Sequence, residues 1–190
     1  MACKKIRCGT LNVRGLNSLK KQYQLKRVLE KFPDIEVLAI QETKIESDEA
    51  TRRLITQHFA HNYDVVVSHA KDYSGGCLLL VKKTLPFTHV YHATDDEGRV
   101  IMLDCKIRDE NWRLINVYAP NDNKKRKEFF EGLHACMRTS SNVLLLGDFN
   151  CTMSMQDCSC KGKVHDESVE SLHAILEAYD LVDVAVGVPG

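Results

Sequence analysis

The sequence contains no long hydrophobic stretch. Its longest uninterrupted apolar run is the five residues Cys77–Val81, whereas a membrane-spanning helix needs about 20 apolar residues. The first residues include Lys4 and Lys5 and have no apolar core of the kind found in a secretory signal peptide. These two absences favour an intracellular protein that does not span or anchor in a membrane.

The sequence also contains no C-x-x-C pair, although it has eight cysteines. This absence excludes a thioredoxin-type redox motif and a zinc ribbon, and it fits a reducing compartment. Cys151, Cys158 and Cys160 lie near His165 and form the one cluster worth weighing as a metal site. Their spacing matches none of the usual zinc patterns, which favours free or half-buried thiols.

A net charge is likewise absent, because 26 basic side chains balance 26 acidic ones. The balance is uneven along the chain: the first 156 residues carry +5 and the last 34 carry −5. Neutrality of the whole chain therefore does not argue against a polyanionic partner. No repeat, linker or low-complexity tract interrupts the 190 residues, so we expect one domain spanning residues 1–190.

Short apolar runs of strand-like content recur along the chain, and several alternate with a period of two. Helical patterns lie between some of them. Ser18 and Asp48 are the expected caps of two helices, and further helices are expected to begin at Asp122 or Asn123 and at about Asp166. The first helix would bury Leu25, Val28, Leu29 and Phe32, and the second Leu54, Ile55, His58 and Phe59. Consecutive strands in the middle third favour a layered α/β or α+β domain with a two-sheet core and helices outside. The nine expected strands are Ile6–Asn12, Val37–Gln41, Asp64–Ser68, Cys77–Val81, Thr88–Ala93, Arg99–Ile107, Trp112–Tyr118, Val143–Leu146 and Leu181–Val186.

Polar residues at the ends of these strands are the most informative feature. Asp148 and Asn150 follow the apolar run Val143–Leu146 and, in extended backbone, point the same way. Glu42 supplies a second carboxylate and Asn12 a second amide at other strand ends. Magnesium takes few carboxylates together with water and phosphate oxygens, so these residues suit such a site. Taken singly, each motif is better explained by a turn after a strand, whereas all of them together favour a site.

Five short motifs occur in an order that resembles the endonuclease/exonuclease/phosphatase superfamily. The closest likeness is to the apurinic-type endonuclease domain of non-LTR (LINE-type) retrotransposons. The resemblance implies a four-layer α/β sandwich of two mixed sheets face to face with outer helices. It also implies a Mg²⁺-dependent phosphodiester hydrolase, with Mn²⁺ as an alternative metal. The motifs are L-N-V-R-G-L at 11–16, Q-E-T-K at 41–44, S-G-G at 74–76, N-V-Y-A-P at 116–120 and G-D-F-N at 147–150.

The resemblance further implies a partner, a location and a role for each motif. The partner is double-stranded DNA, nicked to leave a 3′-hydroxyl for retrotransposition, in the nucleus and with no obligate protein partner. The metal ligands would be Glu42 foremost, with Asn12, Asp148 and Asn150. Asp148 would also orient or deprotonate the attacking water, Asn150 and Tyr118 would hydrogen-bond the phosphate, and Arg14, Lys44 and Asn116 would support substrate binding. Tyr118 could instead be a core aromatic residue.

The family's later motifs, S-R-x-D and S-D-H, do not occur in the sequence. We therefore expect the terminal strands to be missing and nicking by this chain to be impaired. The alternatives are a catalytically inactive remnant, a DNA- or protein-binding module or, within the superfamily, an abasic-site repair nuclease or a phosphatase. The basic run Lys124–Lys127 fits DNA phosphates and a solvated helix face equally well.

Overall fold

The computed structural model describes residues 5–71, 74–153 and 166–184. The chain divides into two compact units, of which the first comprises Met1–Tyr118 with Ser141–Asp148. The second comprises Ala119–Ser140 with Phe149–Gly190. The eight strands of the described residues belong to the first unit, together with helices α1 and α2.

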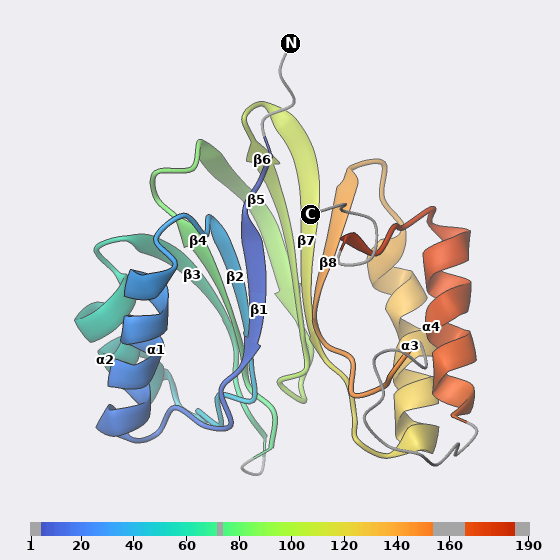
Figure 1. Cartoon of the computed structure of the whole chain (residues 1–190), viewed down its shortest axis with the longest axis horizontal. Coiled ribbons are helices and arrows are strands. Elements are labelled where there is room, and N and C mark those ends of the chain that lie inside the picture. The colour runs from blue at the N-terminus through green and yellow to red at the C-terminus, as the bar shows by residue number, and fades with distance from the viewer. Residues whose placement is uncertain (1–4, 72–73, 154–165, 185–190) are drawn as a thin grey trace. The chain divides into compact units, whose positions relative to one another are not determined.

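The first four strands form a mixed sheet with the order β1-β2-β4-β3 (Figure 1). Strands β1 and β2 are parallel, whereas β4 is antiparallel to both β2 and β3. The strands are β1 Cys8–Asn12, β2 Val37–Gln41, β3 Tyr63–Ser68 and β4 Cys77–Lys82.

The last four strands form a second mixed sheet with the order β5-β6-β7-β8. Successive strands are antiparallel except β7 and β8, which are parallel. The strands are β5 Phe87–Thr94, β6 Val100–Ile107, β7 Glu110–Tyr118 and β8 Asn142–Asp148.

Strand β4 shows why the inner strands read as continuous apolar runs. Cys77, Leu79 and Val81 join one buried cluster with residues of the second sheet, including Leu103 and Leu114. The alternate residues of β4 join another cluster on the opposite face of the sheet. Because successive side chains of a strand point to opposite faces and both faces are buried here, β4 is apolar from Cys77 to Val81. The predicted pair of mixed sheets packed face to face is confirmed.

Helices α1 and α2 cover the outer face of the first sheet (Figure 1). Helix α1, Leu19–Lys31, begins after the predicted cap Ser18, whose hydroxyl accepts from the Lys21 backbone. Its Leu25 and Leu29 are buried as expected, but Phe32 lies past the helix end and is 49% exposed, so its predicted burial is wrong.

Helix α2, Asp48–Leu54, continues into one π-helical stretch, η1, over Ile55–Phe59. The expected cap Asp48 is wrong, because the Ser47 hydroxyl caps this helix by accepting from Ala50 N at 3.2 Å. Leu54 and Phe59 are buried as the helical pattern predicts.

The second unit contains helices α3 and α4. Helix α3, Asn123–Met137, is capped by Asp122, one of the two expected caps, and α4, Glu167–Ala178, is capped by the expected Asp166. The strand expected at Leu181–Val186 is wrong over residues 181–184, which contain no strand, and its remainder lies outside the described residues. Cys158, Cys160 and His165 also lie outside them. No helix of the described segments is long and apolar enough to cross a membrane.

Candidate active site

Four of the predicted site residues lie at the carboxyl ends of two parallel strand pairs. Asn12 ends β1 and is in register with Gln41, directly before Glu42. In the other sheet, Tyr118 ends β7 and is in register with Asp148, the last residue of β8. Ligands of α/β proteins commonly bind outside the carboxyl ends of parallel strands. Here one such edge from each sheet contributes to the same site.

Hydrogen bonds connect the two edges. The amide nitrogen of Asn12 donates to Asp148 Oδ2 at 2.8 Å, across 136 positions of sequence. Hydrogen bonding with Asn12 and with Tyr118 helps to lower the pKa of Glu42, and Lys44 Nζ lies 3.0 Å from Glu42 Oε1. The structure therefore brings together five residues from four separate motifs.

The two titratable groups at the centre are shifted in opposite directions. Partial burial by itself raises the pKa of Glu42, but hydrogen bonds from Lys44, Asn12 and Tyr118 and the Lys44 charge hold this pKa below its ordinary value. Burial, followed by the negative charge of Glu42, raises the pKa of the Tyr118 phenol. At neutral pH, Glu42 is thus an anion and Tyr118 a protonated hydrogen-bond donor.

The loops of the site have unusual backbone conformations. Among the described non-glycine residues with positive φ are four of the predicted site residues: Arg14 at 50°, Glu42 at 58°, Lys44 at 58° and Asn150 at 49°. Such left-handed conformations are uncommon outside glycine and gather at functional sites, where surrounding contacts maintain them. The backbone strain marks the same segments as the motifs do.

Two glycines permit the close approaches that hold these loops. A Cβ on Gly76, whose φ is +85°, would lie 2.3 Å from Thr43 Oγ1, in the segment that follows Glu42. A Cβ on Gly147, with φ at +151°, would lie 2.1 Å from the Val117 carbonyl oxygen. The glycines in S-G-G and G-D-F-N are therefore required by packing.

Asn116 lies behind the site and not on its surface. Its side chain is fully buried, accepts from Gln41 Nε2 at 2.7 Å and donates to the carbonyls of Ile40 at 3.1 Å and Leu78 at 2.9 Å. Because Asn116 has no exposed surface, the support of substrate binding predicted for it would act through its neighbours. It links the two sheets directly behind Glu42 and Tyr118.

The remaining predicted residues differ in their surroundings. Arg14 is exposed, and its backbone N–H donates to Asn12 Oδ1 at 3.0 Å. Asn150 belongs to the second unit, where its amide donates to the Ala119 carbonyl at 2.7 Å. Within the basic run, Arg126 is only 2% exposed and Lys127 bonds Glu167 at 2.8 Å, so these two side chains do not form a free phosphate-binding face.

The oxygen donors at the site fit a hard divalent cation. No group of three or more His, Cys, Asp or Glu side chains capable of holding a metal occurs among the described residues. Mg²⁺ needs no such cage, because one or two carboxylates with waters and substrate oxygens suffice. Glu42 and Asp148 provide the carboxylates, and Asn12 donates a hydrogen bond to Asp148 and helps to lower the pKa of Glu42.

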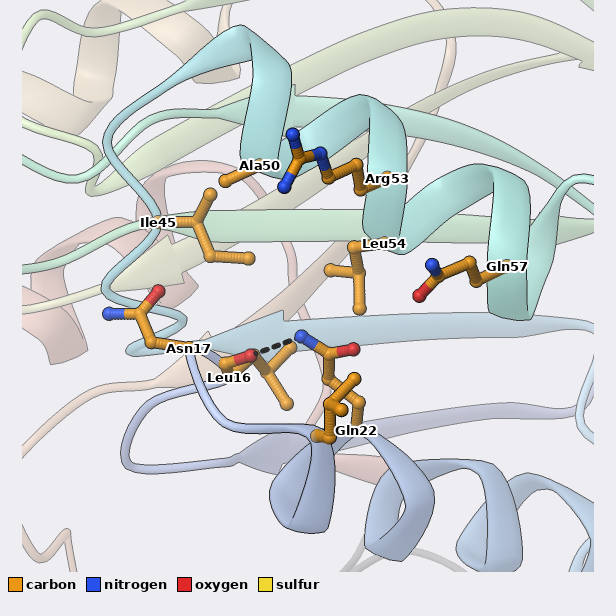
Figure 2. A pocket seen from close by; sticks show the side chains of 9 residues that line it. Leu16, Asn17, Gln22, Ile45, Ala50, Arg53, Leu54 and Gln57 are labelled. Atoms are coloured by element: carbon orange, nitrogen blue, oxygen red, sulfur yellow. Dashed lines mark hydrogen bonds between the residues drawn. The ribbon is translucent and has the colours of Figure 1, made fainter.

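A pocket of about 270 Å³ lies beside the loops that carry Arg14 and Lys44 (Figure 2). Leu16 and Ile45, which follow these loops, line it together with residues of α1 and α2. Gln22 closes one wall by donating to the Leu16 carbonyl at 2.9 Å. The lining contains no carboxylate, so the pocket is separate from the candidate metal site.

Two further residues adjoin the site but were not predicted to be site residues. Gln41 is fully buried and joins Thr10 to Asn116. The Arg99 guanidinium lies over the Tyr118 ring, 5.3 Å from its centroid. The sequence signal for Arg99 was weak, because T-D-D-E-G-R between two strands reads only as a turn.

Comparison with known proteins supports the motif assignment. The model of the Endonuclease/Exonuclease/phosphatase family matches residues 9–159. A 149 kDa protein of transposon TX1 from Xenopus laevis is 37% identical over 90 residues, which are 46% of this chain and 7% of that protein. An exodeoxyribonuclease from Bacillus subtilis is 30% identical over 152 residues, which are 73% of this chain and 56% of that protein.

A solved structure supports the fold. An AP endonuclease from Archaeoglobus fulgidus superposes with a TM-score of 0.70 at 21% identity, covering 92% of this chain and 71% of that one. In the sequence comparison, the chain spans little more than half of the length of the Bacillus subtilis exodeoxyribonuclease. Because the family model covers well over half of the residues, the protein belongs to the Endonuclease/Exonuclease/phosphatase family.

Proposed function

We propose that this chain is a Mg²⁺-dependent phosphodiester hydrolase that nicks double-stranded DNA to leave a 3′-hydroxyl, as retrotransposition requires. The observation that carries the proposal is the gathering of Asn12, Glu42, Tyr118 and Asp148 at the carboxyl ends of two parallel strand pairs, where Asn12 bonds Asp148 and both Asn12 and Tyr118 lower the pKa of Glu42. Carboxylates and amides without a nucleophilic Ser or Cys suit direct attack by water on a phosphodiester.

Each residue has a task in this proposal. Glu42 and Asp148 would hold Mg²⁺, which supplies charge neutralisation for the phosphate when bound. Asp148 would orient or deprotonate the attacking water, and Asn12 would hold Asp148 in place through its hydrogen bond. The Tyr118 hydroxyl and the Asn150 amide would donate to the phosphate oxygens as negative charge grows on them.

DNA is the proposed substrate because the motifs L-N-V-R-G-L and N-V-Y-A-P resemble the nucleic-acid branch of the superfamily. The similarity to an exodeoxyribonuclease supports the same choice. Arg14 is exposed beside Asn12 and could contact a backbone phosphate without reading bases. Lys44 could do the same after leaving Glu42.

The direct test is conversion of supercoiled plasmid to open circles with enzyme in excess. Because residues 1–190 contain no S-D-H motif, we expect turnover about 10² to 10⁴ slower than with a positioned histidine. Nicking should need Mg²⁺ or Mn²⁺, yield ends that a DNA polymerase extends, and disappear in Glu42→Gln. The matched control Glu30→Gln alters an exposed glutamate of α1 and should retain activity.

Two comparisons make this test selective. Faster cleavage of an abasic oligonucleotide would identify a repair nuclease, and release of phosphate from an inositol phosphate would identify a phosphatase. Tight DNA binding with no Glu42-dependent nicking would contradict the proposal in favour of a binding module. Broadening by Mn²⁺ of the NMR signals of Asn12, Glu42 and Asp148 tests the metal site without requiring turnover.

A further inference from the structure

The turn between β5 and β6 is fixed by one carboxylate. Asp95 Oδ1 accepts from the backbone N–H groups of Arg99 and Val100, both at 2.8 Å. It also accepts from the Ser68 hydroxyl at 3.3 Å. A turn with this many internal bonds holds its residues in a defined position relative to both sheets, because Ser68 ends β3 and Val100 begins β6.

This turn is joined to the Glu42 segment through backbone contacts. Gly98 has φ at +69°, and a Cβ there would lie 2.1 Å from the His69 carbonyl oxygen. The Gly98 carbonyl accepts from Gly76 N at 2.8 Å, and the Gly76 carbonyl accepts from Thr43 N at 2.9 Å. Two backbone hydrogen bonds in series therefore connect the turn to Thr43, the residue directly after Glu42.

The same turn is joined to Tyr118 through Arg99. The Arg99 guanidinium lies over the Tyr118 ring, 5.3 Å from the centroid, and its Nη1 donates to the Tyr118 carbonyl at 3.1 Å. In return, Tyr118 N donates to the Arg99 carbonyl at 2.8 Å. A guanidinium stacked on an aromatic face is held by the attraction between its charge and the ring quadrupole.

We propose that Arg99 is a positioning residue for the reaction: it fixes the Tyr118 ring, and the turn that carries it also fixes the Glu42 segment. This inference rests on the proposed function, in which the Tyr118 hydroxyl meets the phosphate and Glu42 holds the metal. The turn between β5 and β6 thereby sets the spacing between the Tyr118 hydroxyl and the Glu42 carboxylate.

The surroundings of Arg99 assign it positioning and not substrate contact. Its side chain is 18% exposed, its flat face lies on the ring, Nη1 is used by Tyr118, and Nε lies 3.5 Å from Glu97 Oε2. Lysine would keep the charge but lose the planar fork that bonds the carbonyl and stacks at once. Arg99→Lys should therefore still position the Tyr118 ring in part, and Arg99→Met should not position it.

The test compares Arg99→Met and Arg99→Lys with Arg113→Met. Arg113 is a matched control because it also pairs a partly buried guanidinium, with Asp104 at 2.6 Å, and its side chain is 12% exposed. In protein labelled with ¹³C at the tyrosine rings, the Tyr118 signal is assigned by its loss in Tyr118→Phe. We expect Arg99→Met to shift or broaden this signal, Arg99→Lys to do so less, and Arg113→Met to leave it in place.

Kinetics provide the second measurement. We expect kcat to fall about 10- to 100-fold in Arg99→Met with KM within twofold, as for a displaced catalytic group. Arg99→Lys should recover part of kcat. An unchanged Tyr118 signal in Arg99→Met would overturn the inference, as would a raised KM with kcat preserved. If the unaltered chain does not nick DNA at all, the proposed function fails, whereas the NMR comparison still decides whether Arg99 positions Tyr118.

Discussion

The polar cluster around Glu42 in the first unit and the cluster around Arg126 in the second differ in how deeply their charged groups are buried and in backbone conformation. The Arg126 guanidinium makes five hydrogen bonds, to Ser168, Pro120, Asn121, Asn123 and Asp166, at 2.6 to 3.0 Å. Arg126 is buried, whereas the side chains of Glu42 and Lys44 are 17% and 39% exposed and both residues have left-handed backbone.

This difference separates a structural cluster from a functional one. A buried guanidinium with every donor used stabilises its surroundings and has no capacity left for a ligand. A partly exposed carboxylate in a strained loop, such as Glu42, can exchange its partners for a metal. The basic run containing Arg126 and the E-T-K motif both look functional in sequence, and only burial and backbone conformation in the fold distinguish them.

The largest expected effect comes from breaking the saturated cluster. Arg126→Met should lower the free energy of unfolding by about 3 to 5 kcal/mol, because Asp166 and the other acceptors lose a buried charged partner. Urea denaturation measures the loss, and exposed Lys125 provides the control Lys125→Met, which should change stability by less than about 0.5 kcal/mol. Equal effects of the two variants would contradict the structural role of Arg126.

A substitution in the loops of the site should be the next in size. Gly76→Ala should cost about 1 to 3 kcal/mol, because alanine is strained at this positive φ and its Cβ meets Thr43. Gly132→Ala is the matched control: nothing lies within 4 Å of its added Cβ in α3, so it should gain about 0.5 to 1 kcal/mol. Thermal unfolding should therefore show a lower melting temperature for Gly76→Ala and a higher one for Gly132→Ala; a higher melting temperature for Gly76→Ala would contradict the loop geometry.

Removal of Lys44 should change binding more than stability. Lys44→Met frees Glu42 from the ammonium 3.0 Å away, so Mn²⁺ should bind about fivefold more tightly, while DNA binding weakens through the lost cation. Titrations with Mn²⁺ and with a DNA duplex measure the two effects. Lys26→Met, which alters an exposed ion pair on α1, should change neither the Mn²⁺ affinity nor the DNA affinity. A loss of Mn²⁺ affinity in Lys44→Met would contradict the idea that Lys44 and the metal compete for Glu42.

The smallest effect concerns pH. Burial opposes ionisation of Asp166, but hydrogen bonds from Ser168 and Arg126 hold its pKa below the ordinary value, and the pKa of Glu42 is lowered likewise. A lowered carboxyl pKa stabilises the folded state above the ordinary pKa, and this stability is lost as pH falls through the lowered value. Asp166→Asn should reduce the loss of stability at acidic pH more than Glu42→Gln does, because Arg126, the partner of Asp166, is more buried than Lys44, the partner of Glu42. Urea denaturation at several acidic pH values measures this difference.

Much of the fold was predictable because its signals are local. Strand β2 was predicted with its observed bounds, Val37–Gln41, since it is apolar on both faces and ends at a polar motif. The caps Ser18 and Asp166 were recognisable from residue type and position. At α2, Ser47 and Asp48 are both capable caps, and the choice between them depended on which side chain reached a free N–H.

The site was predictable only in part. Glu42, Asn12, Tyr118 and Asp148 were nominated by their motifs, and the structure brings them together. The burial of Asn116 was not predictable, because an asparagine between apolar residues reads the same whether it faces a ligand or another sheet. Arg99 and Arg126 were indistinguishable from surface arginines, since Tyr118, on which Arg99 stacks, and Asp166 and Ser168, which bond Arg126, lie in other segments of the chain.

The sequence by itself determined which polar residues end the strands and which segments form the strands and helices, because both depend on neighbouring residues and their periodicity. Only the tertiary structure decided which of these polar groups meet. The contact between Asn12 and Asp148 spans 136 positions, and it follows from the register of two sheets and their packing. No local pattern encodes such a contact, so pairing, burial and strain in the folded chain distinguish the candidate site from an ordinary polar surface.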